Sequence, residues 1–151
     1  LNNLYATLVS AQLGKDYSDT DTRKALSNAR VISADVTDGV NPIFLQGVEL
    51  SNTARLGHGV AIKRFGRGFD ANSEFIAGIR KLLDENSIPY QTQTYKVDVG
   101  GGGTIGGFLS REDMEVIDLG VPVLSMHSPY ELSSKVDVWN FYRLMSAFYS
   151  Q

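Results

Sequence analysis

Several residues with chemically useful side chains or backbone lie beside segments that are expected to form strands. Asp35 ends the apolar run VISAD, and His127 follows the apolar run VPVLSM. Lys63 ends the run GVAIK, and four consecutive glycines, Gly100–Gly103, precede Thr104. Ligands of open α/β sheets bind outside the carboxyl ends of the strands. These positions are therefore candidates for a functional site.

Asp35 and His127 together offer the donors of a metal site. An imidazole nitrogen and a carboxylate oxygen at neighbouring strand ends can share a zinc ion. Each residue also has an ordinary structural interpretation. His127 can be a hydrogen-bonded histidine at the edge of the core, and Asp35 can cap the turn expected over Thr37–Pro42. The residues alone leave both interpretations open.

The glycine run has two interpretations as well. Gly100–Gly103 can bring the backbone close to a ligand, and a helix starting at Thr104 would offer N–H groups to an anion. The run can also be a tight strand-to-helix crossing. The phosphate-loop lysine is missing, so nucleotide binding is the weakest hypothesis.

Lys63 is either a surface cation or a contact to a substrate carbonyl or carboxylate. His58, between two glycines, is assigned no role.

The composition excludes several classes of function. The 151-residue chain has a net charge of −3 and no basic run, so neither a nucleic acid nor a membrane is expected as a partner. No apolar segment approaches the roughly 20 residues of a membrane span. The absence of cysteine excludes disulfides and thiolate chemistry, and it fits a cytoplasmic protein. Neither HExxH nor GxSxG occurs.

The hydrophobic pattern predicts one α/β domain with a largely parallel sheet. Helices are expected over Leu1–Leu13, from Asp19–Asp21 to about Asn28, after a cap at Asn72, over Thr104–Ser110 and over Ser134–Tyr149. Strands are expected over Arg30–Val36, Gly57–Phe65, part of Ile88–Val99, Glu115–Leu119 and the run that leads into His127. The last helix is apolar almost all round and is expected to be packed.

Four segments, taken in order, resemble the C-terminal half of the aspartyl aminopeptidase family of dinuclear zinc exopeptidases. They are ISAD, GHGVAIK, GGGGTIGGFL and VIDLGVPVLSMHSPYE. The resemblance implies a three-layer α/β/α sandwich with a mostly parallel or mixed sheet, incomplete in this chain. It also implies a zinc-dependent aminopeptidase that hydrolyses N-terminal residues from peptides, with two zinc ions per subunit or other divalent metals in their place.

The resemblance assigns roles to individual residues. Asp35 corresponds to a ligand of one zinc ion, and His127 corresponds to a ligand of the other. The residues that correspond to the substrate pocket are Lys63, Gly102, Gly103, Thr104 and Ile105. Ser128 and Glu131 would orient His127, the alternative being that they cap the loop. No catalytic residue is expected in this chain, because the general-base glutamate would lie upstream of Leu1.

The chain also departs from the family pattern. Members specific for acidic residues read SADxAHAxHPN, whereas this chain reads SADVTDGVNP, with Asp38 and Asn41 in place of the two histidines. Specificity for acidic residues is therefore not implied.

Residues 1–151 are expected to be the C-terminal portion of the catalytic domain, without the dimerisation domain and the N-terminal metal ligands. The expected partners are a peptide substrate, the missing N-terminal part and further copies in a homo-oligomer. This chain alone would be inactive. The alternative hypothesis is a catalytically incompetent α/β fragment with a structural or binding role.

Overall fold

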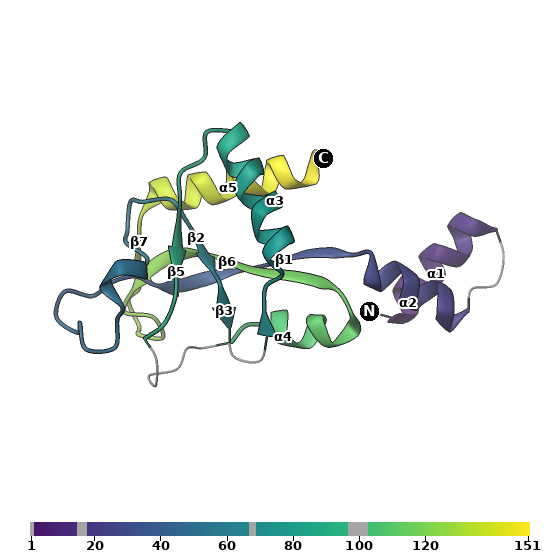
Figure 1. Ribbon diagram of the computed structural model, residues 1–151, viewed down its shortest axis with the longest axis horizontal. Coiled ribbons are helices and arrows are strands. Elements are labelled where there is room, and N and C mark those ends of the chain that lie inside the picture. Colours follow the sequence, from purple (N-terminus) through teal and green to yellow (C-terminus); the bar gives the residue numbers. More distant parts are fainter. Residues whose placement is uncertain (1, 15–17, 67–68, 97–102) are drawn as a thin grey trace.

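The structure is a computed structural model that describes residues 2–14, 18–66, 69–96 and 103–151 (Figure 1). The helices are α1 (Asn2–Leu13), α2 (Asp19–Ser27), α3 (Ser73–Glu85), α4 (Gly106–Leu109) and α5 (Lys135–Tyr149), with short 3-10 helices at Leu50–Asn52 and Ser110–Glu112. The strands are β1 (Arg30–Asp38), β2 (Val60–Lys63), β3 (Phe65–Gly66), β4 (Phe69–Asp70), β5 (Tyr90–Gln93), β6 (Glu115–Leu124) and β7 (Leu132–Ser133).

The main sheet has five strands in the order β1-β6-β2-β5, with β7 paired to the end of β6. β1 and β6 are parallel, β2 runs antiparallel to β6, and β5 is parallel to β2. The sheet is thus mixed, which confirms the predicted α/β class. β3 and β4 form a separate two-stranded hairpin.

One face of the sheet holds the hydrophobic core. Alternate residues Ile62, Ile117 and Leu119 are fully buried on this face and pack with Leu83 of α3 and Leu144 of α5. α3 and α5 lie together on this side, and α4 lies on the opposite side (Figure 1). Fully burying such side chains contributes roughly 1.5–3 kcal/mol each. This face provides most of the packing energy.

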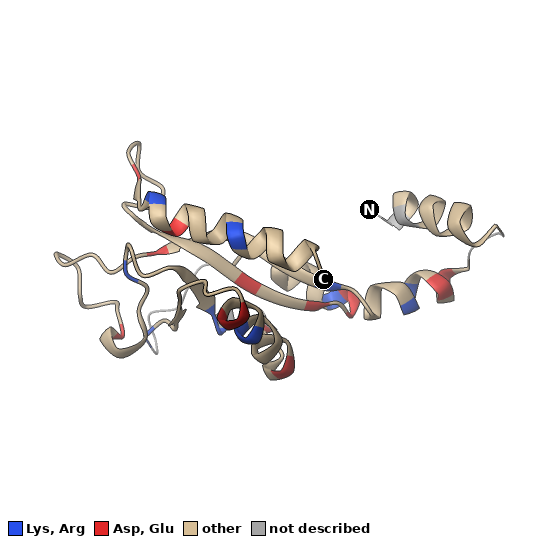
Figure 2. Ribbon diagram, turned by 90° about the horizontal axis from the view of Figure 1, so that it is seen from above, with Lys and Arg blue, Asp and Glu red and all other residues tan. Residues whose placement is uncertain are grey.

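α1 and α2 extend beyond the end of the sheet at the start of β1 (Figures 1 and 2). Two leucines of α1 are largely exposed, with Leu4 at 63% and Leu8 at 58%. Acidic and basic residues lie along α2, α3 and α5, whereas α1 carries neither, as Figure 2 shows. No helix of the described residues has the length and apolar character to span a membrane.

Local chemistry explains where the helices begin. Ser18 and Asp21 form a reciprocal capping box at the start of α2. The Asn72 side chain accepts a hydrogen bond from the Glu74 amide, which confirms the predicted cap of α3.

β1 is longer than predicted. The expected turn over Thr37–Pro42 begins only after Asp38, because the Thr37 hydroxyl is buried and donates to the Gln93 side chain from β5. The Gly39 amide then donates to the Val123 carbonyl at 2.7 Å, and this bond keeps the chain beside β6. Asp35 therefore lies within a strand and not at its end.

Two other predicted elements differ from the observed ones. β6 is one ten-residue strand where two segments were expected, and His127 lies three residues beyond its end. α5 is packed on one face only, because Val138 is 53% exposed and Trp139 is 59% exposed. Trp139 stacks on Tyr142 instead, with 5.3 Å between the ring centroids.

The start of β2 is held by a buried carboxylate. Asp137, which is fully buried near the start of α5, accepts from the amides of Gly57 at 2.6 Å and Gly59 at 2.7 Å. Both glycines have positive φ, at +81° and +90°. A β-carbon on Gly59 would lie 2.0 Å from the Pro89 carbonyl oxygen, whereas one on Gly57 would meet nothing within 4 Å. Only Gly59 is therefore constrained by space as well as by φ.

We predict that Gly59→Ala lowers the free energy of unfolding by about 3 kcal/mol or more, because it combines a positive-φ cost with a backbone clash. The matched variant Gly57→Ala pays only the positive-φ cost of about 1–2 kcal/mol. Urea unfolding of both variants of the whole protein measures the difference. Equal losses of stability would contradict the assigned clash.

Candidate active site

Five of the predicted site residues meet at one pocket on the face of the sheet opposite α3 and α5. The pocket has a volume of about 340 Å³. It is lined by Asp35, Val36, Asp38, Lys63, Tyr95, Gly103, Thr104, Met126 and His127. Segments from four distant parts of the sequence therefore form a single concave site.

Asp35 and His127 reach the pocket from adjacent parts of the sheet. Asp35 on β1 is in register with Gly120 on β6, and its side chain is exposed. His127 lies in the turn after β6 with φ +67°, and its backbone amide donates to Glu131 Oε1 at 2.7 Å. Among the described residues, the ring nitrogens of His127 have no hydrogen-bond partner. The imidazole and the carboxylate are thus both available to a ligand.

Lys63 is buried and not a surface cation. It is only 7% exposed, and its Nζ donates to the Val36 carbonyl at 2.9 Å. Burial lowers the pKa of the Lys63 amine below its usual 10.5, while the carboxylates of Asp118, Asp35 and Asp38 act in the opposite direction. An ammonium group has three donors, so donors beyond the one used by Val36 remain for a ligand.

A row of buried polar residues crosses the sheet beneath the pocket. The register pairs Gln93 with Lys63, Lys63 with Asp118, and Asp118 with Ser33. All of them are less than 9% exposed. The sheet therefore has one apolar face that packs against α3 and α5 and one polar face that carries the pocket.

Thr104 contacts this row through its hydroxyl. Its hydroxyl donates to Asp118 Oδ1 at 2.6 Å and lies 2.6 Å from the Ser33 hydroxyl oxygen. Sequence reasoning missed Asp118. Its only signal is a single charged residue in the apolar run VIDLGV.

Tyr95 is a further lining residue that the sequence did not indicate. Burial raises the pKa of its phenol, and its hydrogen bond with Thr37 acts in the opposite direction. Gln93 supports this wall, because its Nε2 donates to the Asp38 carbonyl at 3.0 Å. Tyr95 thus stays protonated at neutral pH and offers a hydroxyl beside the pocket.

The remaining predicted site residues lie in different places. Gly102 is outside the described residues. Ile105 is 65% exposed and does not line the pocket. The Ser128 hydroxyl donates to the Tyr130 carbonyl and accepts from the Tyr130 amide, as the loop-capping alternative expects. Glu131 contacts the backbone of His127 and not its ring.

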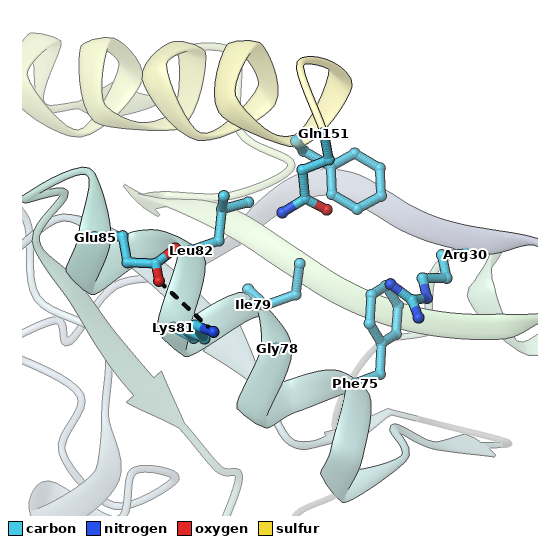
Figure 3. Close-up of a pocket in the computed structure, with 9 residues that line it drawn as sticks. Arg30, Phe75, Gly78, Ile79, Lys81, Leu82, Glu85 and Gln151 are labelled. Atoms are coloured by element: carbon cyan, nitrogen blue, oxygen red, sulfur yellow. Dashed lines mark ion pairs between the residues drawn. The ribbon is translucent and has the colours of Figure 1, made fainter.

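A second pocket lies between α3 and the end of the chain (Figure 3). Its volume is about 230 Å³, and its walls include Phe75, Ile79 and Leu82. The charged groups at its rim include Lys81 and Glu85, an exposed ion pair with 3.7 Å between nitrogen and oxygen. Of the described residues that line it, Glu85 is the one carboxylate and is paired with Lys81, and none is a histidine, so the pocket of Asp35 and His127 is the better candidate.

The candidate site has the donor types of a divalent-metal centre but not a full set. An imidazole and a carboxylate are ligands that zinc prefers, and zinc usually takes four. Within the described residues, no three side chains of His, Cys, Asp or Glu are grouped to hold a metal ion.

An α/β sheet with an imidazole and a carboxylate at one pocket is typical of metal-dependent hydrolases. Residues 3–149 match the family described as Aminopeptidase I zinc metalloprotease (M18), and the chain belongs to that family. This match confirms the resemblance found in the sequence.

Individual relatives agree with the family match. A probable M18 family aminopeptidase 1 from Borrelia garinii is 41% identical over 143 residues, which are 90% of this chain and 31% of the relative. A relative of the same description from Thermotoga maritima is 44% identical over 126 residues, 79% of this chain and 28% of the relative.

Solved structures support the fold. The crystal structure of an M18-family aminopeptidase from Thermotoga maritima has a TM-score of 0.90 and 38% identity, covering 97% of this chain and 34% of that one. Aminopeptidase I from Clostridium acetobutylicum has a TM-score of 0.82 and 39% identity, covering 93% and 32%. The chain spans about a third of the length of the relatives it matches.

The buried Lys63 generates a pH prediction. Its pKa in the folded state lies below the unfolded value, so the folded state releases the proton first as the pH rises. The cost of burying the cation is therefore fully present below the folded pKa and is relieved as the pH rises from the folded pKa towards 10.5.

We predict that Asp118→Asn lowers the pKa of Lys63 further, because it removes the carboxylate whose attraction most strongly opposes the effect of burial on that pKa. An NMR titration of the lysine side-chain amines measures the shift. Lys81, exposed and paired with Glu85, is the internal control whose titration stays unchanged. A Lys63 pKa that does not fall in the variant would contradict the assigned interaction.

Proposed function

We propose that the whole protein is a zinc-dependent aminopeptidase that removes N-terminal residues from peptides. In this proposal, the chain supplies one ligand to each of two metal ions and one wall of the substrate pocket. The observation that carries the proposal is the meeting of Asp35, His127 and Lys63 at one pocket. Membership of a zinc metalloprotease family supports it.

The residues present fit zinc in type. Both Asp35 and His127 are exposed at the pocket, and no described residue hydrogen bonds with the His127 ring, so a ring nitrogen can serve as a ligand. Two donors are fewer than two zinc ions require. The other ligands and the general base would come from the part of the protein outside these residues, since the relatives are about three times as long as this chain. When bound, the metal would lower the pKa of a water molecule and polarise the scissile carbonyl.

The chain's own residues would hold and orient the peptide. Glu131 fixes the backbone of His127 and so restricts the direction of the imidazole. The Lys63 ammonium, fixed by the Val36 carbonyl, would donate to a carbonyl or carboxylate oxygen of the substrate. Gly103 would let the peptide approach the backbone closely. The homo-oligomeric assembly and the cytoplasmic location expected from the sequence stay predictions.

We predict that His127→Ala in the whole protein lowers the bound zinc from about two per subunit to about one and lowers peptide hydrolysis more than a hundredfold. Losing a ligand costs more than the 10–100-fold typical of residues that only orient ligands. Asp35→Asn has the same expected effect. Elemental analysis of the purified variants and hydrolysis of aminoacyl substrates measure both quantities.

His58→Ala is the matched control, because His58 is the chain's other histidine and lies exposed in the loop before β2. It keeps both zinc and activity. Unchanged zinc content and activity in the His127 and Asp35 variants would overturn the ligand assignment. A whole protein that binds no zinc and hydrolyses no peptide would favour the non-catalytic alternative.

A further inference from the structure

Two buried polar side chains lie next to the wall of the pocket but do not line the pocket. Ser33 on β1 and Asp118 on β6 are each 2% exposed, and neither is a wall residue. Both interact with the hydroxyl of Thr104, which is a wall residue. A ligand in the pocket therefore meets Thr104, and Ser33 and Asp118 influence that ligand only through their neighbours.

The direction of each hydrogen bond follows from the single proton on the Thr104 hydroxyl. That proton goes to Asp118 Oδ1 at 2.6 Å, so the Ser33 hydroxyl must donate to Thr104 Oγ1, also at 2.6 Å. The Gly106 amide donates to the same Oγ1 at 3.2 Å. Thr104 Oγ1 thus donates once and accepts twice, which is its full capacity. The start of α4 is fixed against two strands through one atom.

Asp118 also faces the second functional part of the pocket. The register places it between Ser33 on β1 and Lys63 on β2. Its charge attracts the Lys63 ammonium, while its Oδ1 holds the Thr104 turn. One carboxylate therefore interacts with both Thr104 and the buried Lys63 ammonium, and it links their positions.

A strand buried on both faces does not need a charge at this position. The neighbours of Asp118, Ile117 and Leu119, are fully buried and apolar. The Asp118 side chain points to the other face, and burying a carboxylate there costs free energy unless it is hydrogen-bonded and faces an opposite charge. Within the described residues, the side-chain hydrogen bond of Asp118 leads to the pocket turn and not to a neighbouring strand. Through this bond, the Asp118 carboxylate therefore fixes a residue of the pocket wall and does not link neighbouring strands.

We propose that Asp118, with Ser33, is a positioning residue that holds the Thr104 turn at a set distance from Lys63 and so shapes the wall that binds the peptide. This inference rests on the proposed function and deepens it. Asp118 and Ser33 contact neither substrate nor metal in this account. Their effect is transmitted through Thr104 and Lys63.

The test uses the whole protein and two readouts, hydrogen exchange of residues 103–109 and steady-state hydrolysis. We predict that Ser33→Ala speeds exchange of this segment about three- to tenfold, because one neutral hydrogen bond is lost. Asp118→Asn speeds it about tenfold or more, because the lost partner is charged. Both variants raise KM by similar factors and change kcat less. Should Asp118→Asn not yield folded protein, Ser33→Ala decides, because it alters no charge.

Asp137→Asn is the matched control. Asp137 is another buried aspartate, and it holds the loop at the start of β2 through Gly57 and Gly59. Its substitution lowers the unfolding midpoint but leaves KM and the exchange of residues 103–109 unchanged. If the effects came only from a general loss of stability, KM and the exchange of residues 103–109 would change alike in all three variants.

A double-mutant cycle tests whether the effect passes through Thr104. If it does, Ser33→Ala adds little to the KM of Thr104→Val, which already lacks the hydroxyl. Additive effects, or unchanged exchange of residues 103–109 in both Ser33→Ala and Asp118→Asn, would overturn the positioning role. A wild-type protein without aminopeptidase activity would instead remove the proposed function, and the exchange readout would still decide whether Asp118 and Ser33 hold the turn.

Discussion

The pairing of β6 with its neighbours is the constraint on which the site depends. β6 lies between β1 and β2 and also pairs with β7, so three strands take their register from it. Residues 116–123 are all buried. Because side chains alternate along a strand, a slip of one residue would place Asp118 in the core and Leu119 at the pocket. The large cost of that exchange keeps Asp118 beside both Lys63 and Ser33.

One face of the sheet provides stability, and the other carries the candidate site. The face toward α3 and α5 is apolar, and its burial offsets the cost of the buried charges on the other face. On that other face, Lys63 and Asp118 are held by register and hydrogen bonds and not by packing alone. A binding wall built on strands is more precise than one built on loops. Asp35 and Lys63 lie on strands. The Thr104 hydroxyl is hydrogen-bonded to β1 through Ser33 and to β6 through Asp118.

Much of the fold could be predicted from local signals, whereas the site depended on contacts between distant residues. Asn72 caps α3 because of its own side chain, so the sequence reveals it. Thr37 resembled a turn residue, and only its bond to Gln93 extends β1. Lys63 resembled a surface cation until the partner strands were known, and Asp118 was hidden within an apolar run. The residues alone left the pairing of Asp35 with His127 open, and the family resemblance decided it, since hydrophobic periodicity carries no information on which strand ends meet.

A metal centre shared by Asp35 and His127 in the whole protein would be visible by anomalous diffraction at the zinc edge, from crystals of the whole protein grown with zinc. We expect two anomalous peaks in the pocket, one at the Asp35 carboxylate and one at the His127 imidazole. Bound zinc located only elsewhere in the protein, with no peak at either side chain, would contradict it.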